Sequence, residues 1–347
     1  MKSLLRLFAV IAIFLIGKSA DAQKEIYLDE KWEKCKKSVA AYKAIVTKVE
    51  GGLNHIDVFH YPANNPWTTG NYTSKIPQLK SAEGLITWYH PDGSIMQKTT
   101  YVNGKEEGDD WSYWPDGSVQ IHRFYKHGIE EGCWYWLTEK GDTTLIKNYS
   151  SGKLHGELIR MNPGHVLVEK SNYFDGKLHG DYAAYFGKDS LDMQGQYDMG
   201  SMQGTWKYYH KNGQLASKEE YSSGNIQSAE IFNENGKKEE LKITLEQLIA
   251  APAYQGGPEN LNKVLLANVV YPEEAKENNI QGKVYVSIKL DPSGVVQKTW
   301  LTRKKIGYGL DEEALKAARE LTDWQVYYNH NRKYLYTITV PINFSLK

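Results

Sequence analysis

The stretch GLITWYHPDG at residues 84–93 sets the pattern that most of this 347-residue chain follows. An aromatic and β-branched run is closed by Pro-Asp-Gly, and the next run, residues 94–102, is closed by Asn103-Gly104. Asp-Gly and Asn-Gly between such runs are typical of tight hairpin turns, because these turns need positive φ angles. The stretch therefore predicts two short antiparallel strands.

The same unit recurs every 24 residues with no insertion or deletion. Each unit has a tyrosine and a glycine three residues later. A second glycine follows four residues after that in every unit except the last, where Ser228 takes its place. The three columns are Tyr101, Tyr125, Tyr149, Tyr173, Tyr197 and Tyr221; Gly104, Gly128, Gly152, Gly176, Gly200 and Gly224; and Gly84, Gly108, Gly132, Gly156, Gly180 and Gly204. A fixed period indicates one repeated structural unit, and since a lone hairpin cannot bury its face, we expect the hairpins to stack with their aromatic rings in ladders.

The unit pattern Gly-x-x-x-Gly-x-Trp-x-Tyr, then Asp/Asn-Gly, then Tyr-x-x-Gly, resembles MORN repeats in their bacterial variant form. The best copy is GSMQGTWKY at residues 200–208, followed by Lys-Asn-Gly213. The resemblance covers residues 57–236 and implies an all-β array that serves as a scaffold or binding surface.

Residues 1–22 have the features of a secretory signal peptide. Lys2 and Arg6 precede an apolar run at residues 7–17, and Ala20 and Ala22 flank a cleavage site. An uncleaved anchor is the alternative, although a spanning helix needs about 20 apolar residues. We expect cleavage, no lipid anchor and a periplasmic location, with inner-membrane anchoring as the less favoured alternative.

The rest of the chain outside the repeats divides into three expected parts. Residues 23–56 fit either a short helix or the first strands of the array, residues 237–250 form a linker, and residues 251–347 form a second domain. Cys35 and Cys133 are expected to be isolated, mostly buried thiols, with a disulfide between them left open.

The second domain reads as a small α+β layer. Helical spacing covers residues 259–267, Pro272 opens a second helix, and Asp311 is expected to cap a helix over 311–322. Strict alternation predicts strands at 283–291 and 334–344, with a return strand at 295–303. We expect helices on one side of a three-stranded antiparallel sheet.

This order, with YPEEA at 271–275, IQGKV at 280–284, DPSGV at 291–295, LDEEAL at 310–315 and VPINF at 340–344, resembles the C-terminal domain of TonB, an envelope energy transducer. In that family the domain pairs the edge of its last strand with a segment of an outer-membrane receptor. The resemblance implies binding of a TonB-dependent receptor or another envelope protein along residues 333–344. The implied partner-binding residues are Tyr334, Tyr336, Thr337, Ile338, Thr339 and Val340, with Tyr271 and Pro272 nearby.

The sequence of the last strand supports peptide binding independently of the family resemblance. A long alternating strand at a sheet edge presents unpaired N–H and C=O groups that can accept an added strand, and Pro341 removes one donor. A second copy of the chain could pair through the same strand, which would give a homodimer. The competing interpretation is a packing module with no receptor. The chain also has no proline-rich spacer between the array and this domain, so force transmission is not expected to follow from the resemblance.

Chemistry is scarce in this sequence. Lys plus Arg and Asp plus Glu both number 42, so no strong field selects nucleic acid. One column in phase, Glu107, Glu131, His155, His179, Gln203 and Gln227, invites a metal. Its members would lie about 10 Å apart, since each repeat adds two strands, and polar turn residues are the expectation. We expect no enzyme, no cofactor and no metal; the alternative function is a carbohydrate-binding or carbohydrate-degrading envelope protein that uses the aromatic face.

Overall fold

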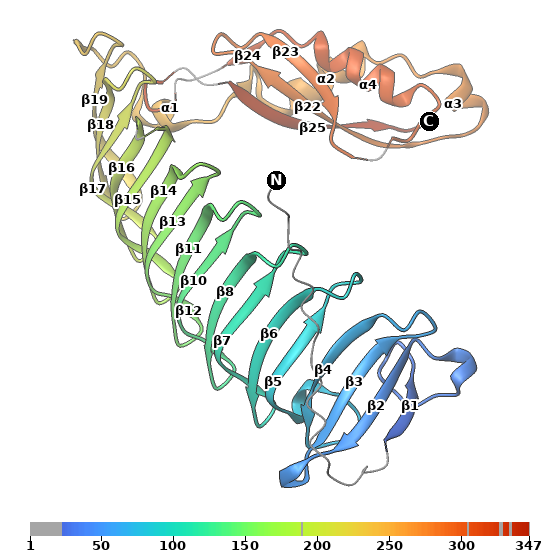
Figure 1. Ribbon diagram of the computed structural model, residues 1–347. Helices are drawn as coiled ribbons and strands as arrows, with labels where there is room; N and C mark the ends of the chain where they lie inside the picture. The colour runs from blue at the N-terminus through green and yellow to red at the C-terminus, as the bar shows by residue number, and fades with distance from the viewer. Residues whose placement is uncertain (1–22, 189, 304, 326–328, 333–334, 347) are drawn as a thin grey trace, which may run out of the picture. The chain divides into compact units, whose positions relative to one another are not determined.

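The computed structural model describes residues 23–346 except 189, 304, 326–328 and 333–334 (Figure 1). The chain divides into two compact units, residues 1–154 and 155–347, which are described separately below. The expected signal peptide at residues 1–22 lies outside the described residues.

The first unit is built from antiparallel strands. Residues 23–56 form strands rather than a long helix, because Ile26, Leu28, Ala44 and Val46 alternate with half-buried residues and are buried together. The strands are β1 (Lys24–Leu28), β2 (Tyr42–Lys48), β3 (Asn54–His60), β4 (Pro66–Tyr72), β5 (Ala82–Tyr89), β6 (Ile95–Val102), β7 (Lys105–Tyr113), β8 (Val119–Lys126), β9 (Ile129–Glu130), β10 (Gly132–Leu137), β11 (Thr143–Ser150) and β12 (Lys153–Leu154). Short 3₁₀ turns stand at Lys37–Val39, Glu50–Gly52 and Leu79–Ser81.

The predicted tight turns are present. Asn103 (φ 53°) and Gly104 (φ 73°) join β6 to β7, with Val102 paired to Lys105 across the turn. Two successive residues with positive φ define the turn that best matches the twist of a hairpin. The same geometry recurs at residues 127–128, 151–152, 175–176, 199–200 and 223–224.

The second glycine column has a role that the sequence did not indicate. Gly108 (φ 79°) lies in a bulge of β7, where the partners of β6 jump from Thr99↔Asp110 to Tyr101↔Glu106. Gly180 and Gly204 lie in equivalent bulges of the second unit. The column is glycine because a bulge that needs positive φ tolerates few other residues.

The second unit begins with repeats of the same kind. Their strands are β13 (Gly156–Asn162), β14 (Val166–Phe174), β15 (Lys177–Gly187), β16 (Ser190–Asp198), β17 (Ser201–Tyr209), β18 (Leu215–Ser222), β19 (Asn225–Phe232) and β20 (Lys238–Glu239). Trp206, Tyr208 and Tyr221 are buried, and Tyr182 and Tyr197 pack against them. The aromatic ladder is therefore a core.

The C-terminal part of this unit is the expected α+β layer. It contains α2 (Gly257–Asn268), α3 (Glu273–Glu277), β22 (Gly282–Leu290), β23 (Val296–Leu301), α4 (Leu310–Arg319) and β25 (Tyr336–Phe344), with the short elements α1 (Leu245–Ile249), β21 (Ala253–Tyr254) and β24 (Trp324–Gln325). The sheet is antiparallel in the order β23-β22-β25. Leu265 of α2 and Leu310, Ala314 and Ala318 of α4 share one core with the inward side chains of β22, so the helices cover one face (Figure 1). The predicted fold class, stacked antiparallel hairpins followed by a small α+β domain, is confirmed.

Three local expectations are wrong. Gly309, not Asp311, caps α4; the buried Asp311 carboxylate instead accepts hydrogen bonds from the backbone N–H groups of Ile306 and Gly307. Pro272 is the N-cap of α3, one position earlier than expected. Cys133 is exposed, because its side chain points away from the buried Trp134, and both cysteines are free thiols.

No helix within the described part of the chain combines the length and the apolar composition needed to cross a bilayer.

Candidate functional site

Strand β25 is an edge strand. It pairs with β22 over all nine residues, from Leu290↔Tyr336 to Gly282↔Phe344, and within the described residues its other side carries no strand. Its burial alternates: Val340, Ile342 and Phe344 point into the core, whereas Thr337, Thr339, Pro341 and Asn343 are exposed. The edge predicted from the alternating sequence is therefore present.

The backbone groups that face outward can be assigned from one hydrogen bond. The carbonyl of Tyr285 on β22 accepts from the N–H of Thr302, which follows β23, at 3.1 Å. Tyr285 thus directs its backbone groups away from β25, and its partner Pro341 directs its own away from β22. Because direction alternates along a strand, the free edge receives the N–H and C=O groups of Thr337, Thr339 and Asn343, and only the carbonyl of Pro341.

The predicted site residues divide accordingly. Thr337 and Thr339 offer their backbone to the free edge, while the backbone groups of Ile338 and Val340 point toward β22. Tyr336 is half-buried at the start of the strand, where its hydroxyl accepts a hydrogen bond from the Asn329 N–H at 3.2 Å and burial raises its pKa. Tyr334 lies outside the described residues.

The two remaining predicted residues lie near the other end of β25. The Tyr271 hydroxyl donates to the Ile280 carbonyl at 2.6 Å, and its ring meets that of Phe344 edge-on at 5.8 Å. Pro272 follows and starts α3. The predicted residues therefore do not form one cluster. Tyr336 to Val340 lie on β25, whereas Tyr271 and Pro272 lie near its C-terminal end.

The sheet beside this edge is electropositive. Its three strands contain Lys283, Lys289 and Lys298 and no acidic residue. These lysines share the face opposite the helices with Thr337 and Thr339, and Arg303 stacks on the Tyr285 ring at 3.9 Å. A negatively charged extended segment would meet complementary charge here.

A second polar cluster was not predicted. The turn formed by Asn329, His330, Asn331 and Arg332, just before β25, contacts the last repeats of its own unit. His330 meets Glu219, which is 111 residues away in sequence. The polar NHNR run could have indicated a turn, but no periodicity connects it to the repeats.

Three members of the polar column hold the turns of the next repeat. Glu107 accepts a hydrogen bond from the N–H of His127 at 2.7 Å, and Glu131 and Gln203 accept from Ser151 and Ser223 at 2.8 and 2.9 Å. Each acceptor lies 20 residues before its donor, so one repeat fixes the turn of the next. Within the described residues no group of three or more His, Cys, Asp or Glu side chains has the arrangement of a metal site.

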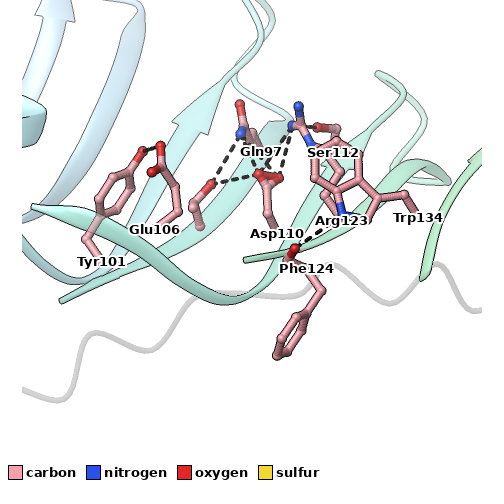
Figure 2. A network of polar contacts seen from close by, with 9 residues as sticks. Gln97, Tyr101, Glu106, Asp110, Ser112, Arg123, Phe124 and Trp134 are labelled. Carbon is pink, nitrogen blue, oxygen red and sulfur yellow. Dashed lines mark hydrogen bonds and ion pairs between the residues drawn. The ribbon is translucent and has the colours of Figure 1, made fainter. Parts of the chain in front are cut away.

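One carboxylate is buried inside the first unit. Asp110 lies between Arg123 and Gln97 (Figure 2). Its side chain is 2% exposed, the Arg123 guanidinium donates to it at 3.0 Å and the Gln97 amide at 2.8 Å. Arg123 also reaches Ser112, and the indole N–H of Trp134 donates to the Phe124 carbonyl. The partners all belong to neighbouring strands, so this network is structural.

The comparisons with known families agree with this architecture. Residues 267–346 match the family model described as Gram-negative bacterial TonB protein C-terminal. Residues 82–103 and 202–223 match the model of the MORN repeat variant. A search of curated proteins finds no match to this chain.

The chain thus carries MORN repeat variants followed by a TonB C-terminal domain, in the order that the sequence predicted. That domain family is a non-enzymatic part of an envelope energy transducer, and the match of this one domain supports a TonB-like protein of the cell envelope.

Proposed function

We propose that this is a non-enzymatic periplasmic protein whose C-terminal domain binds an extended segment of an envelope protein by β-strand addition at β25. A TonB-dependent outer-membrane receptor is the favoured partner, the repeats serve as scaffold, and residues 1–22 are removed on export. The observation that carries the proposal is the free edge with the outward backbone groups of Thr337, Thr339 and Asn343.

Main-chain pairing gives such an edge affinity for many sequences, and side chains select among them. The lysines of the adjoining face favour a segment with Asp or Glu, and the absence of a Pro341 donor limits pairing toward the end of β25. The aromatic alternative for carbohydrate is less well supported, because Trp134 and Trp206 are 5% and 0% exposed and cannot stack on a sugar.

The test titrates the full-length, ¹⁵N-labelled protein with synthetic peptides of about eight residues, a typical strand length. One peptide alternates Val and Thr and carries two Glu residues, and its control has Pro at alternate positions. We expect amide shifts at Thr337, Thr339 and Asn343 with the first peptide only. A Kd of about 1 mM corresponds to a binding free energy of about −4 kcal/mol. The absence of any amide shift at about 1 mM peptide would therefore refute strand addition.

Thr339→Pro provides a sharp variant. It removes an outward N–H without removing a bond to β22, whereas the control Thr339→Val removes only the hydroxyl contact to Ser287 at 2.8 Å. We expect Thr339→Pro to weaken peptide binding about tenfold or more, the effect of losing a hydrogen bond of roughly 1 kcal/mol together with steric exclusion, and Thr339→Val to bind normally. Self-association that grows with protein concentration and is lost in Thr339→Pro would instead assign the edge to a second copy.

A further inference from the structure

A turn of the C-terminal domain is inserted among the last repeats. Asn329 and Arg332 form a β-bridge, and His330 (φ 53°) and Asn331 (φ 58°) form the tip between them. The His330 N–H donates to the carbonyl of Leu248 in α1 at 2.9 Å. The backbone of the tip is therefore that of a tight hairpin turn, fixed from one side by α1.

The imidazole of His330 is held on two sides. Its ring lies parallel to that of Tyr208, with centroids 3.6 Å apart and an interplanar angle of 6°. Its Nδ1 is 2.8 and 2.9 Å from the two oxygens of Glu219, whose side chain is 0% exposed. Burial raises the pKa of Tyr221, with the Glu219 charge adding to the effect, so the Tyr221 hydroxyl stays protonated and donates to Glu219 at 2.8 Å.

The flanking residues of the turn are held as firmly. The Asn331 amide donates to the carbonyls of Ala216 and Phe232 at 3.1 and 2.8 Å. Arg332, 5% exposed, donates to the Asp192 carbonyl at 2.9 Å and pairs with its carboxylate. Residues of β16, β17, β18 and the end of β19 thus converge on one turn.

The 24-residue repeat does not account for a buried carboxylate at position 219. The equivalent positions of the other repeats, at 24-residue intervals, hold Thr99, Arg123, Lys147, Ser171 and Gly195, none of them acidic. A buried carboxylate is costly unless several donors satisfy it. Its own strand supplies two, Ser217 at 2.6 Å and Tyr221, and His330 supplies the third.

We propose that Tyr208, Glu219 and Asp192, with the carbonyls of Ala216 and Phe232, form a docking site whose ligand is the chain's own turn at residues 329–332. Asn329 also donates to the hydroxyl of Tyr336, the first residue of β25. Docking therefore holds the start of the edge strand on the repeats, which gives the end of the array a specific role as a support for the C-terminal domain. The proposal does not depend on what binds at β25.

Hydrogen exchange of the full-length protein, followed by mass spectrometry, tests the site. His330→Ala should speed exchange of residues 329–332 by about tenfold or more, because a docked turn exchanges only through local opening. Fragments of β22 and α4 should exchange as in the wild type. The control His127→Ala alters an exposed turn with a similar positive φ (55°) and should leave residues 329–332 protected.

Two further variants keep the test independent of folding. Glu219→Gln should loosen the same turn, while its neighbour Glu220→Gln should not. The double variant Glu219→Gln, His330→Ala should be no looser than the looser single one, since both act on one contact. Unchanged exchange in His330→Ala, or additive effects in the double variant, would overturn the proposal. Protection that is lost on dilution would also overturn it, because the ligand would then be the turn of a second copy.

Discussion

Two carboxylates are buried in the repeats, and their hydrogen-bond donors come from different parts of the chain. Asp110, 2% exposed, is satisfied inside its own sheet by Arg123, Gln97 and Thr99, all on adjacent strands. Glu219, 0% exposed, is satisfied only in part by Ser217 and Tyr221 on its own strand, and its third partner is His330.

The difference distinguishes a closed network from an open one. The partners of Asp110 are placed by the 24-residue period itself, so the network contributes to the stability of the first unit. The partner of Glu219 comes from outside the periodic sequence, so the same kind of group contributes to docking. A repeat architecture can therefore acquire a binding site by leaving one buried group incompletely satisfied.

The largest expected effect tests the closed network. Asp110→Ala should destabilise β6, β7 and β8 by about 3 kcal/mol, because it leaves the half-buried Arg123 guanidinium without its counter-charge and the Gln97 amide and Thr99 hydroxyl without their acceptor. Native-state hydrogen exchange of the fragments that cover these strands measures it. Asp109→Ala is the matched control, since Asp109 is 57% exposed and pairs with His122; it should cost less than about 1 kcal/mol. A cost for Asp110→Ala as small as that of its control would remove the distinction between the two carboxylates.

The next prediction concerns Gly195, which stands 24 residues before Glu219 and has no room for a side chain. A Cβ added to Gly195, one repeat earlier, would lie 2.2–2.6 Å from ring atoms of the buried Trp206. Gly195→Ala should therefore destabilise β15 to β17 by about 1–3 kcal/mol, the usual cost of overpacking. Thermal unfolding of the single variant and of the pair with Trp206→Leu measures it. In the Trp206→Leu background the alanine should cost little, and an equal cost in both backgrounds would contradict the steric account.

Much of the fold could be predicted because the period itself carries the information. Asn103-Gly104 and the turns in phase with it specify hairpins, and alternation from Val284 to Leu290 specifies the central strand of the second sheet. The bulge role of Gly108 could not be predicted, because an isolated glycine in a strand does not reveal which neighbour changes register. The cap of α4 was assigned wrongly, since Asp311 satisfies a preceding loop instead of the helix end.

The candidate site was predictable in part for the same reason. An alternating last strand and Pro341 indicated an edge, and both features are local. The pairing of Glu219 with His330 joins residues 111 apart with no shared period, so only three-dimensional placement reveals it. The direction of the backbone groups of Thr337 and Thr339 also required the register with β22.

A smaller effect is expected where repeats hold one another's turns. Glu107→Ala removes the acceptor of the His127 N–H and should cost about 0.5–1.5 kcal/mol, the net value of one hydrogen bond. Glu107→Gln should retain nearly all the stability, because Gln203 makes the same contact to Ser223. Hydrogen exchange at residues 126–129 measures both. If Gln were as harmful as Ala, the charge and its contact with the His127 ring at 3.1 Å would matter more than the turn.

The smallest effect contrasts the buried His330–Glu219 pair with an exposed one in the first unit. His55 lies 3.4 Å from Asp57, and their side chains are 38% and 40% exposed. Hydrogen bonding to Asp57 raises the pKa of His55 above 6.5, and hydrogen bonding to His55 lowers the pKa of Asp57 below 3.8. Because the pKa of His55 is raised in the folded state, its interaction stabilises the fold below pH 6.5. This stabilisation is lost as the pH rises through the folded pKa of His55. Because the pKa of Asp57 is lowered in the folded state, its interaction stabilises the fold above pH 3.8. This stabilisation is lost as the pH falls through the folded pKa of Asp57.

The pair should therefore contribute its full stabilisation between about pH 4 and 6.5. Because solvent screens the pair, this contribution should be no more than about 1 kcal/mol. Thermal unfolding of the wild type and of Asp57→Asn across pH 3–9 measures the difference. A difference that grows above pH 8 would have the wrong sign and would show that the two residues do not interact as a pair.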